Sequence, residues 1–384
     1  MNKTYDIAVI GAGVFGAWTA HFLRRSGASV ALLDAYGAAN SRASSGGETR
    51  VIRMGYGPDE LYTRWAMRSL PLWREFASRT GREIFQQTGV LWLSNGDDPY
   101  LKSVCSVLAQ TGVAREEFNA EEIRQRWPQL SFRDVTWGVL EPASGLLLAR
   151  DSVQSLVREL VESGVAYMPA VVRAPRGGGK LTEIETGSGD SISAGTFIFC
   201  CGPWLPKVFP ELLRERIFVT RQEVFFVGTP AGNADFCPPR MPVWLHRTHT
   251  DLPYALPDIE GRGFKIAFDR HGERFDPDAD TRMIAEPSIH SLRAYLRQHI
   301  PALETAPVIE TRVCQYENTW NGDFLVDQHP EFENVWIAGG GSGHGFKHGP
   351  ALGEYLSNRI LNDAPAEPRF SLSAKQTAQK RAVY

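Results

Sequence analysis

A glycine-rich loop near the start of the chain places the strongest constraint on its fold. Residues 11–16 (GAGVFG) match the pattern G-x-G-x-x-G. In a strand–loop–helix unit, the three glycines permit a tight turn, close approach of the backbone to a diphosphate, and close packing of the helix on the strand. Because such a pattern also occurs by chance, the flanking residues decide its interpretation.

Residues on both sides of the loop have the periodicity of a βαβ unit. Residues 5–10 (YDIAVI) predict a strand buried on both faces, as in a parallel sheet. Residues 14–26 predict a helix and residues 29–33 (SVALL) the second strand. Asp34 follows at the separation expected for the carboxylate that binds a ribose hydroxyl. We expect this loop to bind a dinucleotide; the alternative is a loop without a ligand.

Further glycine-rich junctions indicate which dinucleotide is bound. They recur at residues 201–204 (CGPW) and 339–349, far from the first loop. An NAD-binding fold usually lies near one end of a chain, whereas dispersed junctions suit an elongated FAD. The helix predicted from Pro350 would direct its positive end toward the pyrimidine edge of the flavin. FAD is therefore the expected cofactor.

The predicted fold is mixed α/β (α+β), with a Rossmann-like FAD-binding domain and a second, mostly antiparallel β-sheet domain for the substrate. The 384 residues exceed the size at which one hydrophobic core usually stops growing. The FAD-binding domain is expected to be discontinuous, over residues 1–80, 145–215 and 314–365. The substrate domain is expected over residues 81–144 and 216–313, followed by a loosely ordered tail over 366–384.

Other predicted elements are the helices over residues 63–78, 151–163 and 288–299 and the strand over 90–94. Asp151 is expected to cap the second of these helices.

Composition excludes several classes of partner. Lys and Arg number 41 against 44 Asp and Glu, so the net charge of -3 gives no electrostatic basis for binding nucleic acid or an anionic membrane. No apolar run approaches the roughly 18 residues of a membrane span. Five cysteines without a CxxC pair and an N-terminus without a signal pattern favour the cytoplasm. His344 and His348 lack the context of a metal site, so no metal is expected.

Five collinear segments carry a resemblance to a known family. They are residues 47–53 (GETRVIR), Tyr254, residues 263–265 (GFK), 314–316 (CQY) and 343–347 (GHGFK). With these segments the chain resembles, to about Asn362, the family of monomeric sarcosine oxidase and N-methyltryptophan oxidase, within the D-amino acid oxidase-like superfamily.

The resemblance implies an FAD-dependent oxidase of a secondary (N-methyl) or cyclic amino acid. Hydride would pass from the amine α-carbon to flavin N5, water would hydrolyse the imine, and O2 would reoxidise the flavin and give H2O2. The expected partners are therefore a small amine and O2, and the protein is expected to be a monomer or a weak homo-oligomer.

The resemblance implies particular roles for two residues. Cys314 would be attached through its sulfur to the 8α-methyl of the flavin; the alternative is a small buried hydrophobic residue, which is our interpretation of Cys200 and Cys201. Lys265 lies among apolar residues (GFKIAF), so its ammonium needs a partner or loses its charge on burial. The family implies that it assists oxygen reduction; the alternative is a strand lysine that faces solvent.

Further positions match the substrate and flavin contacts of the family. Arg53 and Lys347 match a pair that grips the substrate carboxylate, with a surface ion pair and a helix-entry side chain as alternatives. Tyr254 and Tyr316 match the cavity lining, with core packing as the alternative. The expected catalytic residues are Lys265, Arg50, Tyr254, Tyr316 and His344. The expected FAD-binding residues are Gly11, Gly13, Val14, Phe15, Gly16, Asp34, Ser44, Thr49, Arg50, Val172, Cys201, Gly202, Trp204, Cys314, Gly340, Gly343, His344, Gly345 and Lys347.

Departures from the family leave the amine unnamed. Gly46 and Asp269 stand where the family has histidines, and Trp244, His246, Arg247 and His249 are expected to reshape the cavity before Tyr254. Three other functions remain open: an amine or amino-acid dehydrogenase with another electron acceptor, a fructosyl-amino-acid oxidase, and a non-catalytic flavin-bound scaffold.

Overall fold

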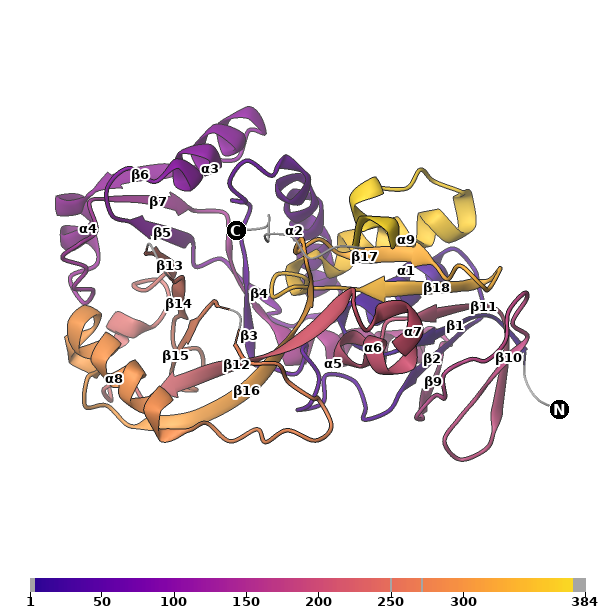
Figure 1. Cartoon of the computed structure of the whole chain (residues 1–384). Helices are drawn as coiled ribbons and strands as arrows, with labels where there is room; N and C mark the ends of the chain where they lie inside the picture. Colours follow the sequence, from indigo (N-terminus) through magenta and orange to yellow (C-terminus); the bar gives the residue numbers. More distant parts are fainter. Residues whose placement is uncertain (1–3, 249–250, 271, 376–384) are drawn as a thin grey trace.

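A mostly parallel seven-stranded sheet forms one side of the molecule in the computed structural model, which describes residues 4–248, 251–270 and 272–375 (Figure 1). Strands β18, β11, β1, β2 and β9 run parallel in that order, with β17 and β10 antiparallel to their neighbours. Their bounds are β1 Thr4–Ile10, β2 Val30–Asp34, β9 Ala166–Pro169, β10 Glu183–Glu185, β11 Ser191–Phe199, β17 Leu325–Gln328 and β18 Val335–Gly339. The predicted βαβ unit is thus present.

Helices pack against this sheet and against each other. Helix α1 follows the glycine loop and packs against α9 and α5, and α2 packs against α9. Their bounds are α1 Val14–Arg25, α2 Glu60–Thr80, α5 Ala149–Glu162 and α9 Gly349–Asn362; the short helices α6 Leu205–Val208 and α7 Pro210–Leu213 follow β11. Helix α5 begins two residues before Asp151, so this carboxylate lies in the first helical turn and is not the predicted cap.

The second large sheet has eight strands and is antiparallel except where β13 runs parallel to β5. Its strand order is β16-β12-β15-β14-β13-β5-β7-β6. The bounds are β5 Val90–Ser94, β6 Glu116–Asn119, β7 Trp137–Glu141, β12 Ile217–Val227, β13 Val243–Arg247, β14 Pro253–Leu256, β15 Phe264–Phe268 and β16 Val308–Thr319, with helices α3 Pro99–Gln110, α4 Ala120–Arg126 and α8 Glu286–His299 beside them. One mostly parallel and one mostly antiparallel sheet confirm the predicted fold class.

A small three-stranded sheet lies between the two large ones (Figure 1). It contains β3 Thr49–Ile52, β8 Gly145–Leu148 and β4 Phe85–Gln86. Strand β3 pairs with β8 from Thr49 opposite Leu148 to Ile52 opposite Gly145. Strand β3 carries Arg50, and Arg53 follows directly after its end.

Alternation along the eight-stranded sheet separates the functional side chains from the core. Phe264 and Ile266 of β15 pack in the hydrophobic cluster that includes α8. Lys265 and Ala267 face the opposite side, where Ala267 packs with Tyr254 and Cys314. The register therefore places residues from three strands on one face, because side chains two apart share a face.

Several residues expected to reshape the cavity lie elsewhere. Trp244 packs in the cluster beside α8, and His246 contacts Tyr295 of that helix. Arg247 pairs with Asp98. His249 lies outside the described residues. The prediction is therefore wrong for Trp244 and His246, because both point to the sheet face away from Lys265.

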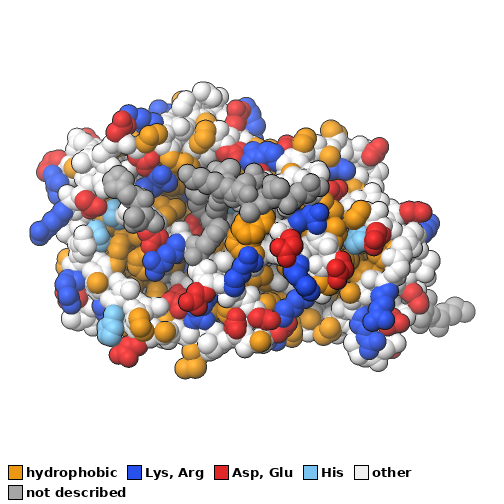
Figure 2. All heavy atoms as spheres, viewed as in Figure 1, with side chains coloured by type: hydrophobic (Ala, Val, Ile, Leu, Met, Phe, Trp, Pro, Cys, Tyr) orange, Lys and Arg blue, Asp and Glu red, His pale blue; other side chains and the backbone are white. Residues whose placement is uncertain are grey.

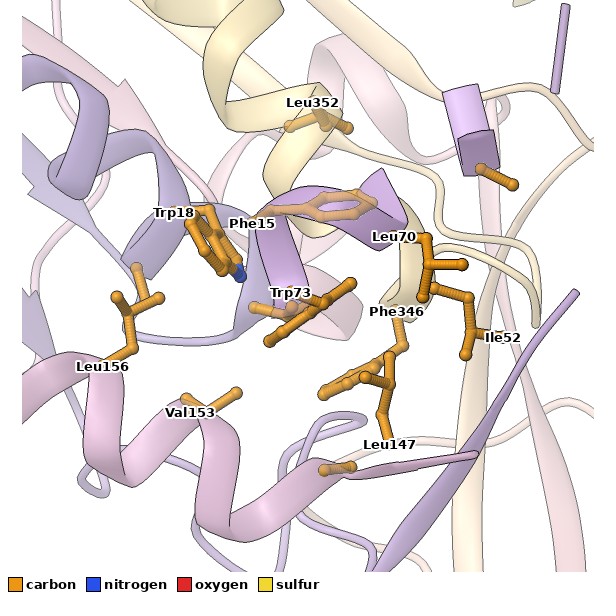
Figure 3. Packing of buried hydrophobic residues seen from close by; sticks show 14 of the residues in the cluster. Phe15, Trp18, Ile52, Leu70, Trp73, Leu147, Val153, Leu156, Phe346 and Leu352 are labelled. Atoms are coloured by element: carbon orange, nitrogen blue, oxygen red, sulfur yellow. The ribbon is translucent and has the colours of Figure 1, made fainter. Parts of the chain in front are cut away.

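An aromatic cluster fixes the segment that follows the last glycine-rich turn (Figure 3). The ring of Phe346 stacks on Trp73, with centroids 5.7 Å apart, and Trp73 meets Trp18 edge-on at 5.1 Å. The Trp73 indole N–H also donates to the carbonyl of Lys347, at 2.9 Å. Buried aromatic pairs of this kind contribute beyond their area. The cluster ties the start of α9 to α1 and α2.

The expected loose tail is wrong for residues 367–375. Phe370 is fully buried in the main core, and Arg369 bridges the carboxylates of Asp59 and Asp323, each at 2.6 Å. The Leu372 N–H donates to Asp327. Residues 376–384 of the expected tail lie outside the described residues.

Charges of both signs are mixed over the face shown in Figure 2. Among the helices of the described residues, none is both long and apolar enough to cross a bilayer.

Candidate cofactor and substrate site

A cleft of about 420 Å³ opens at the carboxyl ends of β1, β2, β11 and β18, beside β16. Ligands of doubly wound sheets bind at this edge. Of the predicted site residues, those that line the cleft are Gly11, Gly13, Val14, Phe15, Asp34, Ser44, Arg50, Val172, Cys201, Gly202, Trp204, Cys314, Tyr316, Gly343 and Gly345. Those outside its lining are Gly16, Thr49, Arg53, Tyr254, Lys265, Gly340, His344 and Lys347.

The glycine loop brings bare backbone to the cleft. Gly11 has φ +107°, and a Cβ there would lie 2.3 Å from the carbonyl oxygen of Cys200. Gly13 occupies the N-cap of α1 without a side-chain cap, while the Val14 N–H donates to Ser45 Oγ at 3.2 Å. Gly16 instead lets the helix approach the loop, since its Cβ would lie 1.8 Å from the Gly11 carbonyl oxygen. The helix start is therefore open to an anion such as a diphosphate.

Asp34 is held in a fixed orientation at the end of β2. Its two carboxylate oxygens accept the N–H groups of Ala12, at 2.8 Å, and Tyr36, at 2.9 Å. Burial raises its pKa, and the backbone hydrogen bonds oppose this effect. Lone pairs remain on both oxygens for a hydroxyl ligand. The Asp34 carboxylate therefore suits the ribose of FAD, and the open helix start suits its diphosphate.

Hydrogen bonds from Trp204 and Lys207 to Asp278 close the outer end of the cleft. Trp204 Nε1 donates to Asp278, at 2.8 Å, and Lys207 Nζ reaches the same carboxylate at 2.6 Å. The Tyr36 ring lies 5.7 Å from that of Trp204. Sequence reasoning missed Tyr36, Lys207 and Asp278. Asp278 lies 71 residues after Lys207 in the chain, so no local pattern connects them.

A chain of polar contacts connects Cys314 to Lys265 at the inner end. Arg50 Nη2 lies 3.6 Å from Cys314 Sγ and 2.7 Å from the Ser44 carbonyl oxygen. Arg50 Nη1 donates to the Thr49 carbonyl at 2.8 Å, and Lys265 Nζ donates to the same oxygen at 2.6 Å. Burial, and secondly the Arg50 guanidinium, hold the pKa of Lys265 well below its usual range. An anion that binds here would favour the charged form of Lys265 and would therefore be stabilised.

Glu48 balances part of this positive charge. Its carboxylate pairs with Arg312 at 2.6 Å, Arg262 at 2.8 Å and Arg150 at 3.2 Å. The Arg312 guanidinium is thus engaged with Glu48. Neighbouring Gly46 has no room for a side chain, since a Cβ would lie 2.0 Å from the carbonyl oxygen of Asn40.

Arg53 and Lys347 come together around Tyr56. The Arg53 guanidinium lies over the Tyr56 ring, 4.4 Å from its centroid, and is 4% exposed. Lys347 Nζ donates to Tyr56 Oη at 2.7 Å and to the His344 carbonyl at 3.0 Å. Tyr56 Oη also meets His348 Nε2 at 2.8 Å. Burial, and then Arg53, lower the pKa of Lys347 well below its usual range.

Two buried cations so arranged favour an anionic partner. Sequence reasoning missed Tyr56, for which no motif gave a signal.

Tyr254, Tyr316 and Asp269 form the third side of this region. Tyr254 and Tyr316 share a hydrogen bond; burial raises the pKa of Tyr254, and Asp269 raises it further. Asp269 also raises the pKa of Lys347, against the effect of burial. Asp269 Oδ1 is buried without a hydrogen-bond partner among the described residues. The Asp269 carboxylate thus lies within the electrostatic field of both residues.

Over residues 4–248, 251–270 and 272–375, no three His, Cys, Asp or Glu side chains gather as a metal site.

Comparisons with known proteins agree over nearly the whole chain. The family described as FAD dependent oxidoreductase matches residues 6–359. Monomeric sarcosine oxidase of Bacillus sp. (strain B-0618) is 30% identical over 397 residues, covering 100% of this chain and 99% of that protein. N-methyl-L-tryptophan oxidase of Salmonella arizonae is 28% identical, covering 94% and 96%. The solved structure of L-proline dehydrogenase from P. horikoshii has a TM-score of 0.84 at 20% identity, covering 99% and 100%.

Proposed function

The chain belongs to the family of FAD-dependent oxidoreductases, and we propose that it is an oxidase of a secondary or cyclic amine that carries a carboxylate. The observation that supports this most is the continuous contact from Cys314 through Arg50 and Thr49 to buried Lys265. It puts a cysteine at one end of the inner wall and two cations beside it.

FAD, when bound, takes a hydride from the amine carbon and passes the electrons to O2, which gives H2O2. Asp34 would hold the ribose, and the open start of α1 would hold the diphosphate. Cys314 Sγ would hold the flavin covalently, as a thioether to its 8α-methyl. This C–S bond would replace one S–H and one C–H bond, and O2 would take up the two hydrogens and two electrons. Arg50 Nη2, 3.6 Å from Sγ, places a positive charge beside the sulfur.

Arg53 and Lys347 bind the substrate carboxylate. Both cations are buried, and the Arg53 guanidinium lies over the rings of Tyr56 and Trp92, 4.4 and 4.8 Å from their centroids. Such a fixed fork binds a carboxylate with two hydrogen bonds. Tyr254 and Tyr316 flank the amine and exclude water from it.

Lys265 and Arg50 supply positive charge where O2 is reduced. Both are hydrogen-bonded to a single carbonyl, so neither needs to reorganise as negative charge develops. His344 is placed differently: its ring contacts Tyr56 Oη at 3.2 Å and it acts by positioning Tyr56 and Lys347.

The experiment that tests this function is anaerobic titration of the purified flavoprotein with a panel of amines. The panel contains N-methyl, cyclic, glycated and primary amino acids, and amides of the best substrates. Bleaching of the flavin by secondary or cyclic amino acids, followed by rapid return of colour and formation of H2O2 in air, is expected. A flavin that no member bleaches would contradict the proposal and support a non-catalytic scaffold.

A dehydrogenase is the second candidate, since the likeness to L-proline dehydrogenase shows the same fold. The discriminating measurement is the rate at which substrate-reduced protein reoxidises in air. Slow reoxidation, with fast transfer to a quinone or dye, would favour it. The buried pair of cations at Thr49 favours the oxidase.

A further inference from the structure

Glu317 inserts a carboxyl group from the second sheet into the edge of the first. It lies on β16, lines the cleft and is 7% exposed. A Cβ added to Gly339, at the end of β18, would lie 2.3 Å from Oε1. A Cβ added to Gly202, just after β11, would lie 4.0 Å from Oε2. The carboxyl therefore sits between the carboxyl ends of β11 and β18.

The hydrogen bonds of this carboxyl are incomplete. The backbone N–H groups of Gly340 and Gly341 donate to it, while Oε1 is buried without a partner among the described residues. Burial raises the pKa of Glu317 to about 8. A buried carboxyl oxygen left unpaired is costly. A ligand group that completes its hydrogen bonding is the simplest physical reason for an acid at this position.

The order of the strands indicates which group of the cofactor passes Glu317. Asp34 at the end of β2 meets the ribose, and the helix start after β1 meets the diphosphate. Strands β11 and β18 come next in the sheet. Glu317 is three residues after Cys314 on one strand, roughly 10 Å from it at about 3.3 Å per residue. Only the ribityl chain of FAD lies between the diphosphate and the flavin ring.

We infer that Glu317 binds a ribityl hydroxyl of FAD through its unpaired carboxyl oxygen. The carboxyl thereby connects the last glycine-rich turn, through Gly340 and Gly341, to the polyol that joins the two halves of the cofactor. This inference depends on the FAD family and not on which amine is oxidised, so failure of every amine to bleach the flavin would leave it intact.

The test compares FAD with its 2′-, 3′- and 4′-deoxyribityl analogues in the full chain carrying Cys314→Ser, which prevents a covalent bond. Affinity is measured by quenching of flavin fluorescence on addition of cofactor-stripped protein. Glu317→Leu is expected to bind FAD at least tenfold more weakly. At least one analogue is expected to bind the Cys314→Ser parent tenfold more weakly than FAD does. The affinity for that analogue should not fall further when Glu317→Leu is added.

Two results would overturn the inference. One is an unchanged FAD affinity in Glu317→Leu. The other is that each analogue binds more weakly than FAD by the same factor in the parent and in Glu317→Leu, which would mean that Glu317 only holds the glycine turn. If Glu317→Leu does not fold, the Cys314→Ser parent alone still tests the inference, because equal affinity for FAD and all three analogues would exclude a hydroxyl contact. Glu310→Gln, on the same strand with its side chain 38% exposed, is the matched control and should bind FAD normally.

Discussion

Lys265 and Arg50 donate hydrogen bonds to the same atom, the carbonyl oxygen of Thr49, at 2.6 and 2.8 Å. The shared acceptor holds two positive groups together inside the protein, although burial and then the Arg50 guanidinium lower the pKa of Lys265. Such an arrangement costs folding free energy. It is therefore expected to serve the reaction.

Lys265→Met should slow the reoxidation of reduced flavin by about 100-fold or more, since removal of one preorganised charged donor typically costs about 10²–10³ in rate. Anaerobic reduction by the amine should change much less. Stopped-flow measurement of both half-reactions separates the two effects. Lys102→Met, an exposed lysine paired with Asp97, is the control. Equal slowing of both half-reactions would argue against a role in oxygen reduction.

Arg53→Lys should raise KM for an amine that carries a carboxylate by about 10- to 100-fold, because a bidentate charged contact becomes a single one. A lysine also lacks the planar group that lies over the Tyr56 and Trp92 rings. The corresponding substrate amide should be affected little. A similar loss with acid and amide would show that Arg53 acts through packing and not through the carboxylate.

Cys314→Ala should release its flavin on denaturation. The wild-type protein is expected to retain fluorescent flavin in a denaturing gel, and the variant to lose it. Cys237→Ala, a half-buried cysteine that does not line the cleft, should retain it. Free flavin from the denatured wild-type protein would refute the covalent bond.

Asp269→Asn should shift substrate preference away from amines with an added hydroxyl or amino group. The carboxylate oxygen without a partner suits a donor on the substrate, and its charge favours a cation. The ratio of kcat/KM for matched amines with and without that group should fall about tenfold, which corresponds to one lost charged hydrogen bond. An unchanged ratio would show that Asp269 does not read the substrate.

His246 should make the protein acid-sensitive. Burial lowers its pKa to about 4 from 6.5. Because the unfolded chain takes up this proton at higher pH than the folded one, stability should be lost as pH falls from about 6.5 toward 4, on the order of 1–3 kcal/mol. Denaturant unfolding of His246→Gln across this range should show a smaller loss. His290→Gln, whose parent side chain is 73% exposed, should behave like wild type.

Local sequence patterns predicted the parts of the site that one short segment builds. The glycine loop and Asp34 are such a case, because 24 consecutive residues from Gly11 contain the loop, helix and strand that place them. The predicted FAD-dependent family is likewise confirmed by the match over residues 6–359. The resemblance, and not periodicity, pointed to Lys265 and Arg50. These two residues lie in different sheets and meet only because both side chains reach the Thr49 carbonyl.

Long-range packing accounts for what the sequence did not show. Tyr56 and Glu317 are ordinary in their local patterns; their roles come from contact with residues roughly 290 and 20 positions away. Trp244 and His246 were assigned to the wrong side because an apolar strand does not reveal which face meets a helix. The tail was misjudged because its polar composition concealed one buried phenylalanine, Phe370.

The bridge from Arg369 to Asp59 and Asp323 sets a practical limit for engineering. Trimming the chain after Asn362 would leave Asp323, which is 3% exposed and accepts a hydrogen bond from Tyr62, without its guanidinium. It would also uncover the core at Phe370. Affinity tags or fused reporters should therefore be attached beyond Lys375. Force applied through this end would pass from Arg369 to Asp59, the residue that precedes helix α2.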